Sequence, residues 1–155
     1  MKRKIVVALL ALAFLTTVAH AQVGFALGAE ATLDILGSGV FPGAALTVSP
    51  PLLPIMFGAG FIIGDPLIVG FTLDWWLLHT PLVGVLRVYF GPGLFLAISH
   101  AVDLGIRLPV GLQLYIVPPF EIFFEIAPHI GISFTQPKPF STIGLVGALG
   151  FRFWF

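Results

Sequence analysis

The chain lacks cysteine and is poor in charge. Charged residues make up 9% of its 155 positions, whereas a water-soluble domain carries about 25%. Because cysteine is absent, disulfide bonds and a lipid anchor attached to cysteine are both excluded. Apolar residues account for 58% of the chain, which indicates residence in a membrane. A bilayer can be spanned only by helices or by a closed β-barrel, since backbone groups must stay hydrogen-bonded in lipid.

Beyond its N-terminus the sequence also lacks an uninterrupted apolar run of helical length. One apolar window that could suggest a helix, residues 81–98, contains Arg87 and the triplet Gly91-Pro92-Gly93. Proline or glycine interrupts the other candidate windows in the same way. A helical inner-membrane protein is the alternative fold, and a helix-dominated circular dichroism spectrum would favour it over a barrel.

The first residues have the pattern of an export signal. Three basic residues at 2–4 precede an apolar run over 5–15, and Ala19-His20-Ala21 offers a small-x-small cleavage site. We therefore expect a signal peptide at 1–21 and one mature domain at 22–155. Removing the signal leaves four basic residues against seven acidic ones, a net charge of 4 − 7 = −3. The mature chain thus has no basic surface for nucleic acid.

Strict alternation of apolar with polar or small residues marks residues 105–132. Every second residue from Ile106 to Ile116 is apolar, and after Pro118-Pro119 the alternation resumes from Ile122. A helix does not produce a period of two, so the pattern predicts two β-strands joined as a hairpin. One face is apolar and the other carries charge and glycine, as in a strand between lipid and a packed lumen.

Segments of the same kind recur along the mature chain, separated by breaks rich in glycine, proline, aspartate and serine. We predict an all-β fold of eight antiparallel strands, closed as an up-and-down transmembrane β-barrel with short turns on both sides. The expected strands are 22–33, 40–48, 55–63, 67–78, 84–98, 104–116, 121–134 and 142–155. With both chain ends in the periplasm, the periplasmic turns are expected near 50, at His79-Thr80-Pro81 and near 118.

Two motifs resemble those of small bacterial outer-membrane β-barrels. The hairpin contains Arg-x-Pro-Val-Gly at 107–111 and Glu-x-Phe-x-Glu at 121–125, and the last segment alternates from Ile143 to a terminal Phe155. The chain is similar in architecture to the eight-stranded outer-membrane protein A and X barrels, whose closing strand typically ends in phenylalanine. The resemblance implies residence in the bacterial outer membrane among its lipids. It also implies that the barrel-assembly machinery recognises the strand ending at Phe155.

The parity of each strand sends its charges to the inner face. An eight-stranded barrel has an interior that side chains just fill, and charges buried there must be paired. We predict ion pairs Asp74–Arg87 and Glu125–Arg152 in the periplasmic half, and Arg107 near His129 or Glu30 in the outer half. The expected structural polar network of the lumen is Glu30, Asp74, Arg87, Arg107, Glu121, Glu125, His129 and Arg152.

Tryptophan and tyrosine gather in the expected periplasmic third of the strands. Such residues are enriched at membrane interfaces, where they form a girdle around a barrel. The sequence therefore predicts one girdle made of Trp75, Trp76, Tyr89, Tyr115 and Trp154.

Proline occurs inside several expected strands. It donates no hydrogen bond to the ladder, and a closed barrel has no edge at which to place it. We therefore expect β-bulges at Pro42, Pro92, Pro109 and Pro128.

The sequence shows no pattern for catalysis, for a cofactor or for a metal ion. Ser99, His100 and Asp103 are close together, but residues of one short turn rarely adopt the geometry of a Ser-His-Asp triad. The histidines have no ligand spacing, and no phosphate-binding loop is present. We expect a protein that is not an enzyme and has a structural or envelope-integrity role. A narrow channel for small solutes and a lipid-modifying enzyme are the alternatives.

Overall fold

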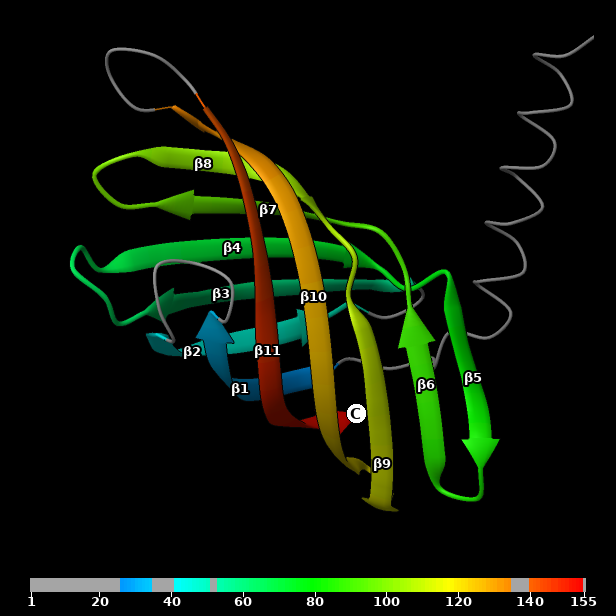
Figure 1. Cartoon of the computed structure of the whole chain (residues 1–155). Coiled ribbons are helices and arrows are strands. Elements are labelled where there is room, and N and C mark those ends of the chain that lie inside the picture. The colour runs from blue at the N-terminus through cyan, green and yellow to red at the C-terminus, as the bar shows by residue number, and fades with distance from the viewer. Residues whose placement is uncertain (1–25, 35–40, 51–52, 135–139, 155) are drawn as a thin grey trace, which may run out of the picture.

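The fold consists of antiparallel β-strands, as predicted. The computed structural model describes residues 26–34, 41–50, 53–134 and 140–154, and none of them belongs to a helix that could cross a membrane. The expected signal peptide at 1–21 lies outside these ranges. The strands are β1 (Ala26–Asp34), β2 (Phe41–Ser49), β3 (Ile55–Ile62), β4 (Ile68–Trp75), β5 (Leu78–Val83), β6 (Leu86–Phe90), β7 (Gly93–Ile98), β8 (Val102–Arg107), β9 (Val110–Val117), β10 (Phe120–Phe134) and β11 (Phe140–Trp154) (Figure 1).

Eight of these strands pair in a ring. The antiparallel pairings run from β1 through β2, β3, β4, β7, β8, β10 and β11, and β11 pairs again with β1. The remaining strands β9, β6 and β5 extend the sheet from β10 of the ring, in that order. The sheet as a whole is not closed, because β5 pairs with β6 and with no other described strand.

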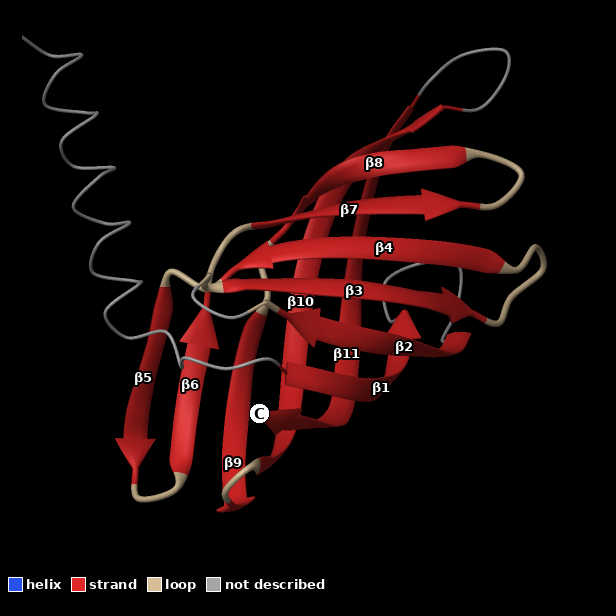
Figure 2. Cartoon of the chain, turned by 180° about the vertical axis from the view of Figure 1, so that it is seen from behind, coloured by secondary structure: helices blue, strands red, loops and turns tan. Residues whose placement is uncertain are grey.

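Prolines interrupt two of the strands that the sequence predicts as continuous. Gly91-Pro92 separates β6 from β7, and Leu108-Pro109 separates β8 from β9. The two breaks lie side by side, because the amide of Gly91 donates a 3.3 Å hydrogen bond to the carbonyl of Pro109. Beyond this line β5, β6 and β9 turn away from β4, β7 and β8 (Figure 2).

The predicted bulges at the prolines are wrong. Pro42 and Pro128 keep a regular register, opposite Leu33 and Leu145, while at Pro92 and Pro109 the strands stop instead of bulging. All four prolines retain a carbonyl that accepts a backbone hydrogen bond, for example from Leu108 to Pro128 at 2.9 Å. The missing amide therefore removes one ladder bond at each site without shifting the register.

The predicted turn at His79-Thr80-Pro81 is wrong as well. These residues lie in β5, and the chain turns at Gly84-Val85. Gly84 has a φ of 56°, a left-handed conformation that residues with a side chain rarely adopt. Pro81 lies in a strand that pairs with no described strand other than β6, and the register shifts between Pro81 and Val83. Proline is tolerated at such edges and irregularities, because there a missing amide costs no ladder hydrogen bond.

The two faces of the sheet differ sharply in polarity. Large apolar side chains are exposed on the outer face of strand after strand, for instance Leu104 at 50% and Ile130 at 48%. Among the described side chains Asp65 is the only exposed charge, and it lies in the β3–β4 connection. Charges inside and an apolar exterior are the arrangement of a membrane-spanning barrel.

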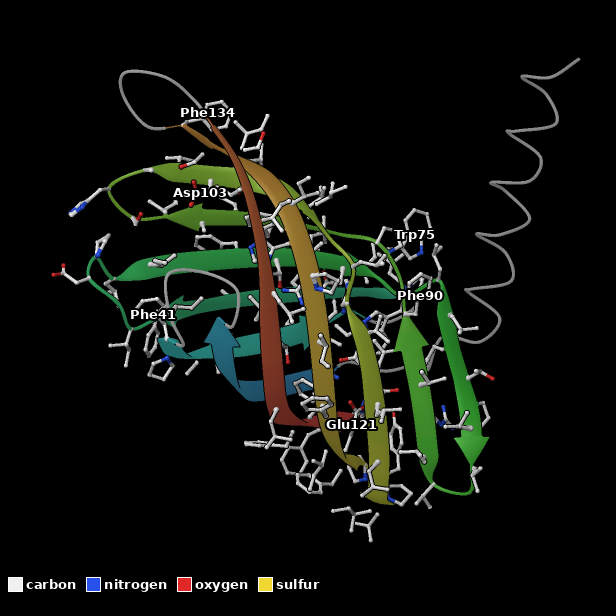
Figure 3. The ribbon with its side chains drawn as sticks, in the orientation of Figure 1. Phe41, Trp75, Phe90, Asp103, Glu121 and Phe134 are labelled. Atoms are coloured by element: carbon white, nitrogen blue, oxygen red, sulfur yellow. The ribbon has the colours of Figure 1, made fainter. Side chains whose placement is uncertain are left out.

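The turns gather at two opposite ends. The connections β3–β4 and β7–β8 lie at one end, which we call the Asp65 end, and the turns β5–β6 and β9–β10 lie at the other, the Pro118 end (Figure 1). Figure 3 shows Asp103 toward the Asp65 end and Glu121 toward the Pro118 end.

Candidate functional site

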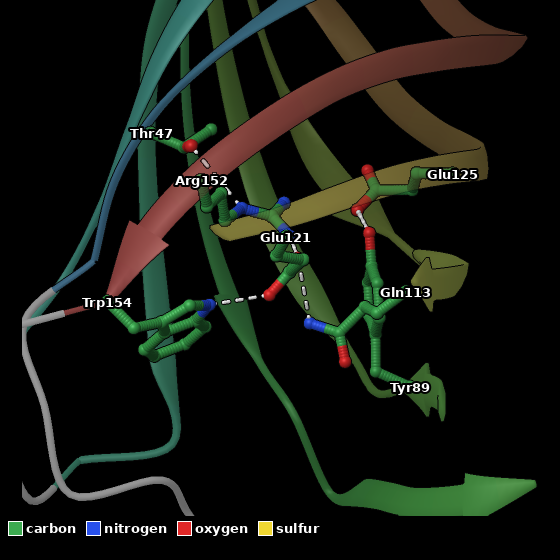
Figure 4. A network of polar contacts seen from close by, with 7 residues as sticks. All are labelled: Thr47, Tyr89, Gln113, Glu121, Glu125, Arg152 and Trp154. Carbon is green, nitrogen blue, oxygen red and sulfur yellow. Dashed lines mark hydrogen bonds and ion pairs between the residues drawn. The ribbon is translucent and has the colours of Figure 1, made fainter. Parts of the chain in front are cut away.

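Arg152 and Glu121 form the centre of a buried polar layer near the Pro118 end. They are neighbours in the β10–β11 register, and Arg152 Nη1 lies 2.7 Å from Glu121 Oε1, with side-chain exposures of 1% and 0%. Glu121 also accepts hydrogen bonds from Gln113 Nε2 at 3.0 Å and from Trp154 Nε1 at 2.6 Å (Figure 4). Arg152 Nε donates to Thr47 Oγ1 at 3.4 Å. The layer thus joins β2, β9, β10 and β11.

Aromatic rings enclose the Arg152 guanidinium. Its central carbon lies 3.5 Å from the ring centroid of Phe123, 5.3 Å from that of Trp76 and 5.8 Å from that of Tyr89. Trp76 and Tyr89 stack on each other with centroids 4.5 Å apart. Each desolvated cation–π contact stabilises the charge by about 2 kcal/mol or more, so these rings supplement the ion pair and exclude water from it.

Arg107 organises a second layer nearer the middle of the barrel. Its Nη2 pairs with Glu125 Oε1, and its Nε lies 3.2 Å from Asp74 Oδ1. Glu125 also accepts a 2.6 Å hydrogen bond from the hydroxyl of Tyr89. Tyr89 therefore touches both layers, through its ring near Arg152 and its hydroxyl on Glu125.

Glycines in the intervening strands allow these contacts. Gly93 is the register neighbour of both Asp74 and Arg107, and a Cβ at Gly93 would collide with the Asp74 carboxylate and lie 3.0 Å from Arg107 Cγ. Gly111 is likewise the neighbour of both Tyr89 and Glu125, and a Cβ there would collide with the Tyr89 ring. Each ion or hydroxyl thus reaches its partner across a strand that has no side chain in the way.

Two of the three predicted charge partnerships are wrong, whereas Arg107 lies next to His129 in the β8–β10 register, as predicted. The structure pairs Asp74 with Arg107 instead of Arg87, and Arg152 with Glu121 instead of Glu125. Sequence parity gives the face of each charge but not the register, and the register decides which charges meet.

The other residues of the predicted network flank the two layers, with Arg87 opposite Gln113 in the β6–β9 register. The Arg87 guanidinium stacks over the Tyr115 ring at 5.0 Å. His129 is the register neighbour of Arg107, and its ring makes an edge contact with Phe95 at 4.8 Å. Glu30 lies in β1, but its side chain is outside the part of the chain whose side chains the structure describes.

The predicted aromatic girdle is wrong for most of its members. Trp76 and Tyr89 are 5% and 0% exposed, and Trp154 donates its indole hydrogen bond to Glu121. Tyr89 and Trp154 share the inward parity of Arg87 and Arg152, so the alternation in the sequence already contained this signal. The predicted polar network did not include Thr47, Tyr89, Gln113 or Trp154.

The half of the interior toward the Asp65 end holds a cavity of about 630 Å³. Its floor includes Arg107 and Glu125, and its walls include small residues such as Gly58, Gly60 and Ala45. The expectation of an interior filled throughout by side chains therefore fits the Pro118 half better than this one.

The chain is similar in fold to two solved membrane proteins, although no protein-family model and no curated protein matches its sequence. The crystal structure of Neisserial surface protein A aligns with a TM-score of 0.58 and 13% identity, over 84% of this chain and 97% of that one. The N-terminal β-barrel domain of Pseudomonas aeruginosa OprF aligns with a TM-score of 0.52 and 14% identity, over 86% and 98%. The chain therefore has the fold of the small bacterial outer-membrane β-barrels.

Proposed function

We propose that this chain is a structural protein of the bacterial outer membrane, with an interior closed by its two polar layers. The apolar exterior, the export pattern at residues 1–21 and the barrel fold support this location. The chain's role is to contribute a stable, sealed barrel to the envelope, with neither a catalysed reaction nor a conducted solute.

The enclosure of Arg152 carries the proposal of a closed interior. This guanidinium bridges side chains from β2 and β10 and lies among three aromatic rings. Separating Arg152 from Glu121 would leave each charge buried without its partner. Breaking a buried pair in this way costs about 3–5 kcal/mol, so the closed state dominates at equilibrium.

Planar-bilayer conductance tests the closed interior. The wild-type barrel is expected to give no large, stable open currents. The double variant Arg152→Ala with Glu121→Ala removes both partners of the buried pair and is expected to produce measurable currents. Large stable currents from the wild-type protein would contradict the proposal.

A narrow channel is the second candidate, and the cavity is the observation that favours it. About 630 Å³ of the lumen toward the Asp65 end is empty of protein atoms, so only the two layers separate this space from the Pro118 end. The conductance measurement above decides between the two functions, because a channel would conduct without removal of Arg152.

A lipid-modifying enzyme is the third candidate function. The structure gives Ser99 a local role, because its backbone amide donates to the carbonyl of Ala101 at 2.8 Å and its Oγ accepts from the amide of Ala101 at 3.4 Å. This supports the expectation of a polar turn. The composition of lipid A acyl chains, compared with and without expression, tests the proposal, and a change upon expression would overturn it.

We also propose that assembly depends on the C-terminal strand. Phe155 lies outside the described residues, but β11 reaches Trp154 with apolar residues alternating along its outer face. Deletion of Phe155 is expected to lower the yield of folded barrel in cells and to leave refolding in detergent unchanged. Equal yields in cells would contradict recognition of this residue by the assembly machinery.

A further inference from the structure

The cavity in the Asp65 half has the size and the lining of a ligand site. Its volume of about 630 Å³ falls within the range of roughly 300–1,000 Å³ that is typical of small-molecule sites. Residues of β2, β3, β4, β7, β8, β10 and β11 line it. Most are small or apolar, as with Ala97 and Phe95, and only a few polar groups converge on it.

The charged groups around the cavity are predominantly acidic. Asp103, Arg107 and Glu125 line it, and Arg107 is also paired with Asp74. Three carboxylates and one guanidinium give a formal charge of 1 − 3 = −2. Arg107 is paired with both Asp74 and Glu125.

Asp103 presents a hydrogen-bond acceptor that the described residues leave unused. Its Oδ1 is buried, and none of the described residues donates a hydrogen bond to it. An ionised carboxylate can only accept hydrogen bonds, and a buried acceptor without a donor costs about 1–3 kcal/mol. A ligand that carries a donor and a positive charge would satisfy both the acceptor and the local charge.

We propose that this cavity binds a small amphipathic cation, an amine on a compact apolar body. The ammonium group pairs with Asp103, and the apolar part lies against Phe95 and the small residues of the opposite strands. The Arg107 layer forms the floor, which makes the cavity a binding site with a closed end. Binding in detergent does not depend on whether the barrel conducts, so this inference stands or fails separately from the proposed function.

Three probes with the same apolar body and different charge test the site. The refolded chain in non-ionic detergent micelles is titrated by calorimetry with 2-phenylethylamine, 2-phenylethanol and phenylacetate, with empty micelles as the blank. A desolvated ion pair contributes about 1.5 kcal/mol or more, so the amine is expected to bind about tenfold more tightly than the alcohol. Phenylacetate is expected to bind least. Equal affinity for the amine and the alcohol, or tighter binding of phenylacetate, would overturn the proposal.

Substitutions locate the site. Asp103→Asn keeps the shape of the side chain and is expected to reduce the affinity for the amine to that for the alcohol. Asp65→Asn removes a carboxylate from the same end but outside the cavity, and is expected to leave the affinity unchanged. Ala97→Leu fills space beside Asp103, its register neighbour, and is expected to weaken amine binding independently of charge. Unchanged amine binding in both Asp103→Asn and Ala97→Leu would contradict the assignment.

Discussion

Arg107 of β8 forms an ion pair with Asp74 of β4 across the intervening strand β7, at the position where β7 has a glycine. Their atoms Nε and Oδ1 are 3.2 Å apart, and Gly93 of β7 lies between them in register. Tyr89 reaches Glu125 over Gly111 in the same manner. Glycine in this barrel thus determines which polar groups meet, in addition to relieving crowding in a narrow interior.

Gly93→Ala is expected to destabilise the barrel by about 1–3 kcal/mol, the usual cost of overpacking. The added methyl group would collide with the Asp74 carboxylate and push it away from Arg107. Gly70→Ala is the matched control, because its Cβ would meet only the Leu96 carbonyl, at 4.0 Å. Urea unfolding midpoints of the refolded proteins measure both effects. Similar midpoints for the two variants would show that the approach over Gly93 is unimportant.

Glu121→Gln is expected to cost about 3–5 kcal/mol of folding free energy, because it leaves the buried Arg152 charge uncompensated. The substitution preserves volume, so packing changes little. Asp65→Asn is the control, since an exposed carboxylate contributes within about 0.5 kcal/mol. Equilibrium unfolding in detergent gives both values. A loss below 1 kcal/mol for Glu121→Gln would mean that Arg152 is hydrated.

Ile126→Arg tests the orientation of the outer face. Ile126 lies near the middle of β10 and is 40% exposed. Arginine at mid-depth in a bilayer costs about 2–4 kcal/mol, and near the interface about 0–1 kcal/mol. Phe134→Arg, at the end of the same strand, is therefore expected to cost less. Unfolding from lipid vesicles measures the difference, and equal costs would argue against a lipid-facing β10.

Fluorescence quenching by lipid distinguishes a tryptophan that faces the membrane from one that is buried in the interior. Trp75 lies on the outward parity of β4, whereas Trp76 is buried among the rings around Arg152. In vesicles with brominated acyl chains, Trp75→Phe is expected to remove most of the lipid-dependent quenching. Trp76→Phe is expected to leave that quenching in place. Loss of most of the quenching in Trp76→Phe, but not in Trp75→Phe, would mean that Trp76 faces lipid, as the sequence predicted.

Local alternation was enough to predict most strand positions, because the face of each residue in a strand depends only on its neighbours in sequence. It did not predict the breaks at Pro92 and Pro109. The expected strand 121–134 corresponds to β10, and 40–48 corresponds to β2 within a residue at each end. The alternation shifts by one residue between β4 and β5, where Trp76 and His79 are both buried and Leu77 and Leu78 are both exposed. Because the alternation breaks there, the sequence pattern placed the turn at residues 79–81 instead of at Gly84.

Pairing across strands was not accessible from the sequence, because it depends on register. Glu121 meets Arg152 because the β10–β11 register aligns them, and the composition of residues 135–139 does not specify that alignment. Arg107 meets Asp74 only because β7 places a glycine between them. A search for inward glycines flanked by opposite charges two strands apart would have found this pair once the register was known.

Envelope fractionation combined with heat-modifiability tests the central claim most directly. A tagged form is expressed in a Gram-negative host, and inner and outer membranes are separated before electrophoresis with and without boiling. We expect the protein to be in the outer membrane and to migrate faster before boiling, since a stable barrel stays folded in the detergent. A soluble or inner-membrane location, with the same mobility before and after boiling, would contradict it.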